Sequence, residues 1–334
     1  MTILDSELKF YKSATVDDTS ANGGRMSAAE IVSGVVQNVF PHVLKAERDS
    51  GSTKYRKLFA KVANDADETL LAAQLWLDNP TPADDWCVMW PGSQTDTQGD
   101  ITGSERLYGC AALASDAAAG GSTLVVDVED ASITGIFQDG DTVRVTDMAD
   151  PSAATGNEEF LTISGTPTVS GTQVTITVAE TLANDYTVAA GSRVSSVYGA
   201  GDVKCSMTGW TETTSAGTYD EATYPPVLDN IGTIEQTWTL EFTDASNYTV
   251  SGDTVGSVGS GSISADFAPQ NPDFSKPYFT LEAAGFGGTW AQGDRIVFTT
   301  HPAAVPIWEK RVVPAGAASL ANNKITLVLS GESA

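Results

Sequence analysis

Two histidines are the side chains of this sequence best suited to acid–base chemistry, and both adjoin a proline. His42 follows Pro41 and His301 precedes Pro302, which indicates that each lies in a turn. A catalytic triad needs a base held by an orienting acid, and the sequence has no GxSxG motif to present a serine. The spacing of the histidines supports no metal site. We therefore expect packed or surface histidines, no catalytic residue and no bound metal.

Carboxylates crowd one short stretch, which contains Asn64, Asp65, Asp67 and Glu68. The glycine and distal glutamate of a calcium-binding helix-loop-helix are missing there, so a solvated turn is the first interpretation. Calcium in an acidic loop stays open, because oxygen-rich loops bind hard cations without a fixed motif. The 43 Asp and Glu residues guarantee chance carboxylate pairs, so glycoside cleavage, the first enzymatic alternative, has no distinct signal.

Two glycine-containing stretches resemble nucleotide-binding loops only superficially. Residues 51–54 read Gly-Ser-Thr-Lys but lack the spacing that ends in GK[ST]. Residues 285–288 read Gly-Phe-Gly-Gly but lack the strand–helix–strand setting of a dinucleotide site. We expect ordinary loops and no cofactor, and we predict that the chain is not an enzyme.

The cysteines and tryptophans also point to packing. Cys87, Cys110 and Cys205 are odd in number and show no CxxC spacing, so we expect free buried thiols. Core packing accounts for most of the seven tryptophans. The alternative is a carbohydrate-binding or receptor-binding surface formed by exposed Trp90, Trp210 or Trp290.

The elements expected around these residues are strands. From Thr123 onward, short runs with period-two alternation recur between Gly, Pro, Asn and Asp clusters. The clearest runs from Ile234 to Phe242, with apolar residues on one face and Glu or Thr on the other. We predict an all-β fold of several β-sandwich or barrel domains, with an extended N-terminal arm and an inserted small β-domain.

The predicted domains follow from glycine-rich boundaries and flanking strands. Residues 1–24 have few apolar anchors and form the arm, which we expect to order against a neighbour. Residues 25–116 form the first part of a core domain, residues 117–198 the inserted domain, and residues 199–334 the β-rich domain that completes the core. The inserted domain is expected to be an exposed spacer, so its deletion should leave the remainder folded. Ser27-Ala28-Ala29-Glu30 fits a helix capping box, but the valines and Gly34 that follow favour a strand or an irregular segment equally.

Charge divides the chain into two unequal parts. Residues 1–61 hold nine basic and seven acidic residues, a net charge of +2, and the remainder holds nine and 36, a net charge of −27. The acidic part would repel nucleic acid and anionic lipid, so we expect neither as a partner. The basic part could contact an acidic neighbour, and its interface candidates are Arg25, Lys54, Arg56 and Lys57. Solubility of an abundant protein is the alternative reason for the charge.

No stretch predicts export or membrane insertion. The first residues lack an apolar run after a basic segment, and no window approaches the roughly 18 apolar residues of a membrane span. We expect synthesis and assembly in a cytoplasm.

Two stretches of the sequence have a recognisable order of residues. One runs from Gly24 to Asn64 and contains Gly24-Arg25-Met26, Phe40-Pro41 and Tyr55-Arg56-Lys57-Leu58-Phe59. The other runs from Asn230 to Ala334 and contains AAGFGGTWAQGDRIVFTTHPAAVPIWEKRVVPAGAAS. In these stretches the chain resembles structural proteins of tailed-bacteriophage virions, of the prophage type. Neither stretch is a catalytic motif, and no functional residue can be transferred from it.

The resemblance implies a non-enzymatic tail component, near the baseplate, that links tube, sheath or hub subunits during assembly in the host bacterium. Phage tails are built on sixfold or threefold axes, so it also implies a hexameric or trimeric ring with contacts between unlike surfaces of neighbouring copies. The alternatives are a head-decoration or neck protein and the carbohydrate-binding or receptor-binding module.

Overall fold

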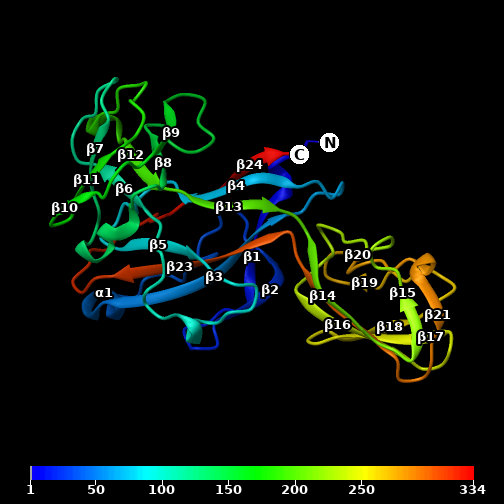
Figure 1. The fold of residues 1–334 in the computed structure, drawn as a ribbon. Coiled ribbons are helices and arrows are strands. Elements are labelled where there is room, and N and C mark those ends of the chain that lie inside the picture. Colours follow the sequence, from blue (N-terminus) through cyan, green and yellow to red (C-terminus); the bar gives the residue numbers. More distant parts are fainter. Residues whose placement is uncertain (1) are drawn as a thin grey trace.

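The alternating sequence folds almost entirely into strands. A computed structural model describes residues 2–334 and contains six sheets, whose hydrogen-bonded neighbours are all antiparallel (Figure 1). The α-helix α1 (Lys45–Ser50) is a single short element between strands. The all-β, multi-domain prediction is confirmed.

A core domain occupies the middle of the molecule and consists of two sheets. The strand order of the first sheet is β2, β1, β3, β23 and β5, with bounds Gly23–Glu30, Leu8–Thr15, Ser52–Val62, Ala304–Val313 and Trp86–Pro91. The second sheet has the order β13 (Tyr198–Val203), β4 (Leu70–Leu77) and β24 (Leu327–Ser333). Apolar side chains from both sheets form one buried cluster that includes Val62, Leu75, Met89 and Ile307.

The N-terminal residues form part of this core domain. The prediction of an arm that orders against a neighbour is wrong for β1, which pairs with β3 from Leu8↔Val62 to Lys12↔Leu58. Tyr11 and Ser13 of this strand are buried. The segment therefore packs into the core domain although it contains few apolar residues. Ser27 and Glu30 lie in strand β2, and the capping-box pattern therefore marks a strand and not a helix.

The inserted domain lies between β5 and β13 and forms a seven-stranded sheet, at the upper left of Figure 1. It begins at β6, a few residues before the predicted boundary at residue 117. The strand order is β10, β11, β7, β6, β12, β8 and β9, with bounds Thr168–Ser170, Gln173–Thr177, Thr123–Asp127, Cys110–Leu113, Arg193–Ser196, Thr142–Thr146 and Glu158–Thr162.

The inserted domain shares its hydrophobic core with the core domain. Trp86, Val88 and Trp90 of β5 belong to the same buried cluster as Leu124 and Val143 of the insert. Deletion of residues 117–197 would therefore expose the tryptophans of β5 to water. The expected independent spacer is not what the structure shows.

A third domain, residues 206–301, is a second insertion, between β13 and β23. Its main sheet has the order β14, β22, β16, β17 and β18, with bounds Ser206–Thr213, Arg295–His301, Gln236–Phe242, Asn247–Gly252 and Gly256–Ser262. Two strand pairs complete it: β15 (Ala216–Tyr219) with β21 (Phe286–Thr289), and β19 (Gln270–Asn271) with β20 (Lys276–Pro277).

The expected single domain over residues 199–334 is thus divided between two bodies. Its ends, β13, β23 and β24, lie in the core domain, and its middle forms the third domain (Figure 1). The expected alternation within β16 is present, since Gln236, Trp238, Leu240 and Phe242 are buried while the residues between them are half-buried. Phe242 stacks on Trp290 with ring centroids 4.1 Å apart, in the centre of an aromatic core.

A buried ion triad joins the inserted domain to the core domain. Asp78, just after β4, accepts from Arg144 Nη1 at 2.6 Å and from Arg193 Nη2 at 2.7 Å. These two arginines are the only basic residues of the segment 117–198. Arg144 is fully buried and Asp78 is 2% exposed, and the Arg144 guanidinium also lies over the Trp76 ring. The low dielectric of such a site makes each ion dependent on its partners.

We expect Asp78→Ala to lower the free energy of unfolding by about 3–5 kcal/mol, because it leaves two arginines without their buried counter-charge. Urea unfolding followed by tryptophan fluorescence measures the change. The control is Asp49→Ala, which removes an exposed ion pair with Lys45 and should cost about 0.5 kcal/mol or less. Equal losses in the two variants would contradict the assignment of the triad as a structural joint.

Candidate interaction surface

The four predicted interface residues lie on β2 and β3, where the structure assigns each to a contact within the chain. Lys57 is 1% exposed, and its ammonium pairs with Asp96 Oδ1 at 2.6 Å and donates to the carbonyl oxygen of Gly24 at 2.7 Å. Asp96 Oδ2 accepts from Trp308 Nε1 at 2.8 Å. Burial lowers the pKa of Lys57. Lys57 therefore forms contacts within the chain and is not available to a partner.

Arg56 and Lys54 hold the loop before β2 and the helix α1 against β3. Arg56 is 6% exposed and donates from Nη1 to Asp18 Oδ1 at 2.8 Å. Lys54 pairs with Glu47 of α1 at 2.9 Å and with Asp18 at 3.3 Å. The prediction that these basic side chains form an exposed contact surface does not agree with their burial and pairing.

Arg25 is directed at the third domain. Its guanidinium forms a bidentate ion pair with Asp253, with Nη2 2.6 Å from Oδ2 and Nη1 3.2 Å from Oδ1. Nη1 also donates to Thr254 Oγ1 at 2.9 Å. These two residues belong to the turn between β17 and β18. Arg25 thus links the core domain to the third domain at one edge of their contact.

The acidic stretch after β3 forms another part of the same joint. Asn230 of the third domain donates from Nδ2 to Asn64 Oδ1 at 2.8 Å and from its backbone nitrogen to Asp67 Oδ1 at 2.6 Å. Asp65 pairs with Lys276. Glu68 contributes its carbonyl oxygen as a further acceptor for Asn230. The stretch that we expected to be a solvated turn therefore carries contacts between domains.

Lys61 is buried at this joint, and no carboxylate within residues 2–334 lies at hydrogen-bond distance from it. Its ammonium donates to the carbonyl oxygen of Ile231 at 2.7 Å and lies over the Phe274 ring, 4.4 Å from the centroid. Burial lowers the pKa of Lys61 to about 8. Its protonation therefore changes within a pH range that is accessible to experiment.

An uncharged segment, residues 31–44, follows the edge strand β2 and is the most conspicuous exposed feature of the core domain. It holds no Asp, Glu, Lys or Arg and contains turns but neither helix nor strand. Val32, Val35 and Val36 are 54%, 55% and 77% exposed. Phe40 anchors the far end of the segment, because the guanidinium of Arg311 lies over its ring. We call residues 31–44 the valine segment.

His301 takes part in a hydrogen-bonded row that the sequence did not predict. Its Nδ1 lies 2.8 Å from Glu235 Oε2 and its Nε2 lies 2.8 Å from Thr208 Oγ1, an order that resembles a catalytic triad. Thr208 and His301 lie on the neighbouring strands β14 and β22, and Glu235 directly precedes β16. The row continues with Thr237 and Thr299, whose hydroxyls are 3.0 Å apart. A ladder of cross-strand polar pairs accounts for the arrangement without catalysis.

The thiols and tryptophans mostly lie in the core, as expected. The three cysteines are free, and burial raises the pKa of Cys110 to about 12 and that of Cys205 to about 11, which makes their thiols unreactive near neutral pH. Trp90 and Trp290 are 4% and 2% exposed, so they cannot form the exposed sugar-binding surface considered above. Trp210 is half-buried and packs on Phe298.

No protein-family model matches the chain, and no curated protein sequence matches it. Within residues 2–334, no helix is long and apolar enough to cross a membrane. No group of three or more His, Cys, Asp or Glu in the described part of the chain could hold a metal ion.

We expect the free energy of unfolding of the native protein, relative to that of Lys61→Met, to rise by about 1–3 kcal/mol between pH 8 and pH 10.5. In this range the unfolded chain still binds a proton that the folded chain has released from Lys61, so deprotonation favours the folded state. Denaturant unfolding of both proteins at several pH values measures the difference, in which all other titrations cancel. A difference independent of pH would show that Lys61 is not buried as described.

Proposed function

We propose that this protein is a non-enzymatic structural component of a bacteriophage tail, near the baseplate, and that it assembles with further copies of itself. The observation that carries the proposal is the valine segment. Loops of this length without secondary structure are uncommon and usually functional, and contiguous exposed apolar residues mark interaction sites. The resemblance of two stretches of the sequence to virion proteins supports the phage setting.

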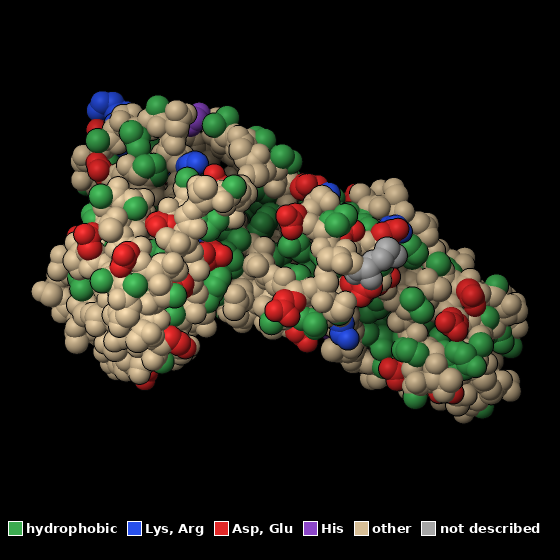
Figure 2. Space-filling model, turned by 90° about the horizontal axis from the view of Figure 1, so that it is seen from above, with side chains coloured by type: hydrophobic (Ala, Val, Ile, Leu, Met, Phe, Trp, Pro, Cys, Tyr) green, Lys and Arg blue, Asp and Glu red, His purple; other side chains and the backbone are tan. Residues whose placement is uncertain are grey.

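The charge distribution favours the valine segment as the contact between copies. Two chains that each carry a net charge of −25 repel one another, and Asp and Glu side chains are spread over the face shown in Figure 2. The valine segment is uncharged and is followed by α1 and β3, which carry six of the nine basic residues of the N-terminal part. Two copies can approach there with less repulsion than through their acidic surfaces.

Backbone geometry favours the same place. Strand β2 is an edge of the core sheet and leads directly into the valine segment. Edge strands expose unpaired backbone donors and acceptors, and valine is favoured in a strand that pairs. A neighbouring copy could therefore extend the core sheet through β2 and cover the valines. A ring of three or six copies, as in phage tails, would repeat this contact around an axis.

We expect the native protein to be oligomeric and Val35→Asp/Val36→Asp to be monomeric, because each new carboxylate would be buried without a partner in the contact. Light scattering coupled to size exclusion measures the mass. The matched control is Val169→Asp, at a valine of the inserted domain that is 54% exposed, which should leave the mass unchanged. A monomeric native protein, or an oligomeric double variant, would contradict the proposed contact.

Copy number in purified particles separates the tail from the rest of the virion. A chain present in a small multiple of three or six supports a tail or baseplate position. A copy number that scales with the capsid would favour the head-decoration alternative. Absence from the particle would refute the virion proposal without affecting the self-association result.

A further inference from the structure

The third domain is attached to the core domain by two short connections that lie side by side. Residues 204–205 lead from β13 into β14, and residues 302–303 lead from β22 back into β23. Ser206 and His301 are cross-strand partners, so both connections meet the main sheet at one corner. Within residues 2–334, no strand of the third domain pairs with a strand of the core domain. The domain can therefore turn about this corner without breaking a strand pair, as hinged domains do.

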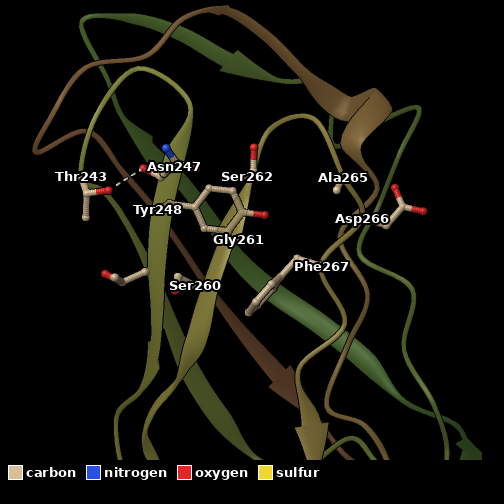
Figure 3. A pocket seen from close by; sticks show the side chains of 10 residues that line it. Thr243, Asn247, Tyr248, Ser260, Gly261, Ser262, Ala265, Asp266 and Phe267 are labelled. Carbon is tan, nitrogen blue, oxygen red and sulfur yellow. Dashed lines mark hydrogen bonds between the residues drawn. The ribbon is translucent and has the colours of Figure 1, made fainter.

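The third domain is held together by its own core and can move as one unit. Its buried cluster is formed by residues between Met207 and Phe298. The packing extends to the end of β17 and β18 that lies away from the core domain. There the Tyr248 ring crosses β18 at Gly261, and Phe267 lies edge-on to this ring with centroids 5.8 Å apart (Figure 3).

The ion pairs between the third domain and the core domain are accessible to solvent. The side chains of Arg25 and Asp253 are 23% and 39% exposed, and those of Lys276 and Asp65 are 35% and 75% exposed. Exposed pairs of this kind stabilise a contact weakly, because water solvates the separated charges nearly as well. These ion pairs can therefore separate at little cost in free energy.

One aromatic side chain of the third domain packs on the core sheet. Phe274, at the tip between β19 and β20, lies edge-on to Tyr11 of β1 with ring centroids 5.7 Å apart. The Lys61 ammonium on β3 lies 4.4 Å from the centroid of the Phe274 ring and donates to the carbonyl oxygen of Ile231. A movement that lifts the third domain off β3 removes Phe274 and Ile231 together and exposes this ammonium to water.

The charge on Lys61 is poorly compensated in this contact. Cys205 of the connection, Asp229 of the third domain and the Tyr11 ring lie near the buried ammonium. Asp229 Oδ1 accepts from two backbone nitrogens of its own loop, each at 2.8 Å, so this carboxylate is engaged elsewhere. Burial lowers the pKa of Lys61 to about 8, because the ammonium gives up its hydration. The charged form of Lys61 therefore favours separation of the domains, and the neutral form favours their contact.

We propose that the third domain swings between the closed arrangement described above and an open one, with residues 204–205 and 301–303 as the hinge and Lys61 as the residue that sets the balance. In the open arrangement Phe274 and Ile231 leave β3, and water hydrates the Lys61 ammonium. The inference rests on neither self-association nor the phage setting. Its consequence is that a neighbouring subunit or a change of pH can reposition the third domain while all three domains stay folded.

Single-molecule fluorescence energy transfer on the full chain tests the inference, at concentrations too low for self-association. The dyes are attached at Ser170→Cys in the inserted domain and Ser260→Cys in the third domain, both exposed positions. The native cysteines do not compete for the dyes, because burial raises the pKa of Cys205 to about 11 and Cys87 and Cys110 are buried. We expect two transfer efficiencies that interconvert. A single efficiency in the native chain and in every variant would overturn the inference.

Two substitutions should shift the populations in opposite directions. Lys61→Met removes the buried charge and should lower the ratio of open to closed molecules by about tenfold or more. Phe274→Ala removes the aromatic contact with β3 and should raise this ratio by about tenfold. The matched control is Phe267→Ala, which removes a half-buried ring packed inside the third domain and should leave the ratio unchanged. Equal responses to the two phenylalanine substitutions would contradict the assignment of Phe274.

A pH series on the native chain tests Lys61 without a substitution in the contact. Between pH 8 and pH 10 the open form still binds the proton that the closed form has released, so the ratio of open to closed molecules should fall by about tenfold or more. The same series on Lys61→Met should show no such fall, which separates Lys61 from other titrating groups. A native ratio that is independent of pH in this range would overturn the role of Lys61.

Discussion

The arrangement of the domains depends on a single buried carboxylate. Asp78 stands at the end of a core strand and receives both arginines of the inserted domain. An ion pair of this kind contributes little net stability compared with apolar packing, but each ion is costly without the others. The triad therefore acts as a positional constraint: the inserted domain can sit on the core in one orientation, and the tryptophan cluster between them is packed for that orientation.

The two insertions are attached in different ways. The inserted domain is joined through buried ions and a shared hydrophobic cluster. The third domain has its own aromatic core. It meets the core domain through polar contacts, of which the Arg25–Asp253 pair is partly exposed, and through a small apolar cluster in which Phe274 packs on Tyr11. Interfaces of the second kind are the more easily rearranged. The molecule thus combines two domains that share a buried core with a third domain held by polar contacts and a small apolar cluster.

Local patterns in the sequence predicted most strands. They did not predict which strands pair with one another or which side chains meet in the folded chain. The alternation from Ile234 to Phe242 fixes both the strand and its buried face, because side chains alternate across a sheet. No local pattern could reveal that β23 would lie between β3 and β5 or that residues 206–301 would separate from the core. The basic residues show the same limit: Lys57 looks like a surface charge until Asp96 and the carbonyl oxygen of Gly24 are placed around it. The exposure of the valine segment became known only from the structure.

The position of β23 in the central sheet also determines when the protein can fold. Strand β3 ends at Val62, and its partner β23 begins at Ala304, so residues 63–303 must be synthesised before the two can pair. At synthesis rates of about 5–20 residues per second this interval lasts about 12–50 seconds. During that time the nascent chain has a long unpaired strand edge on β3, together with both insertions. Both insertions can therefore form before the sheet that carries them is complete.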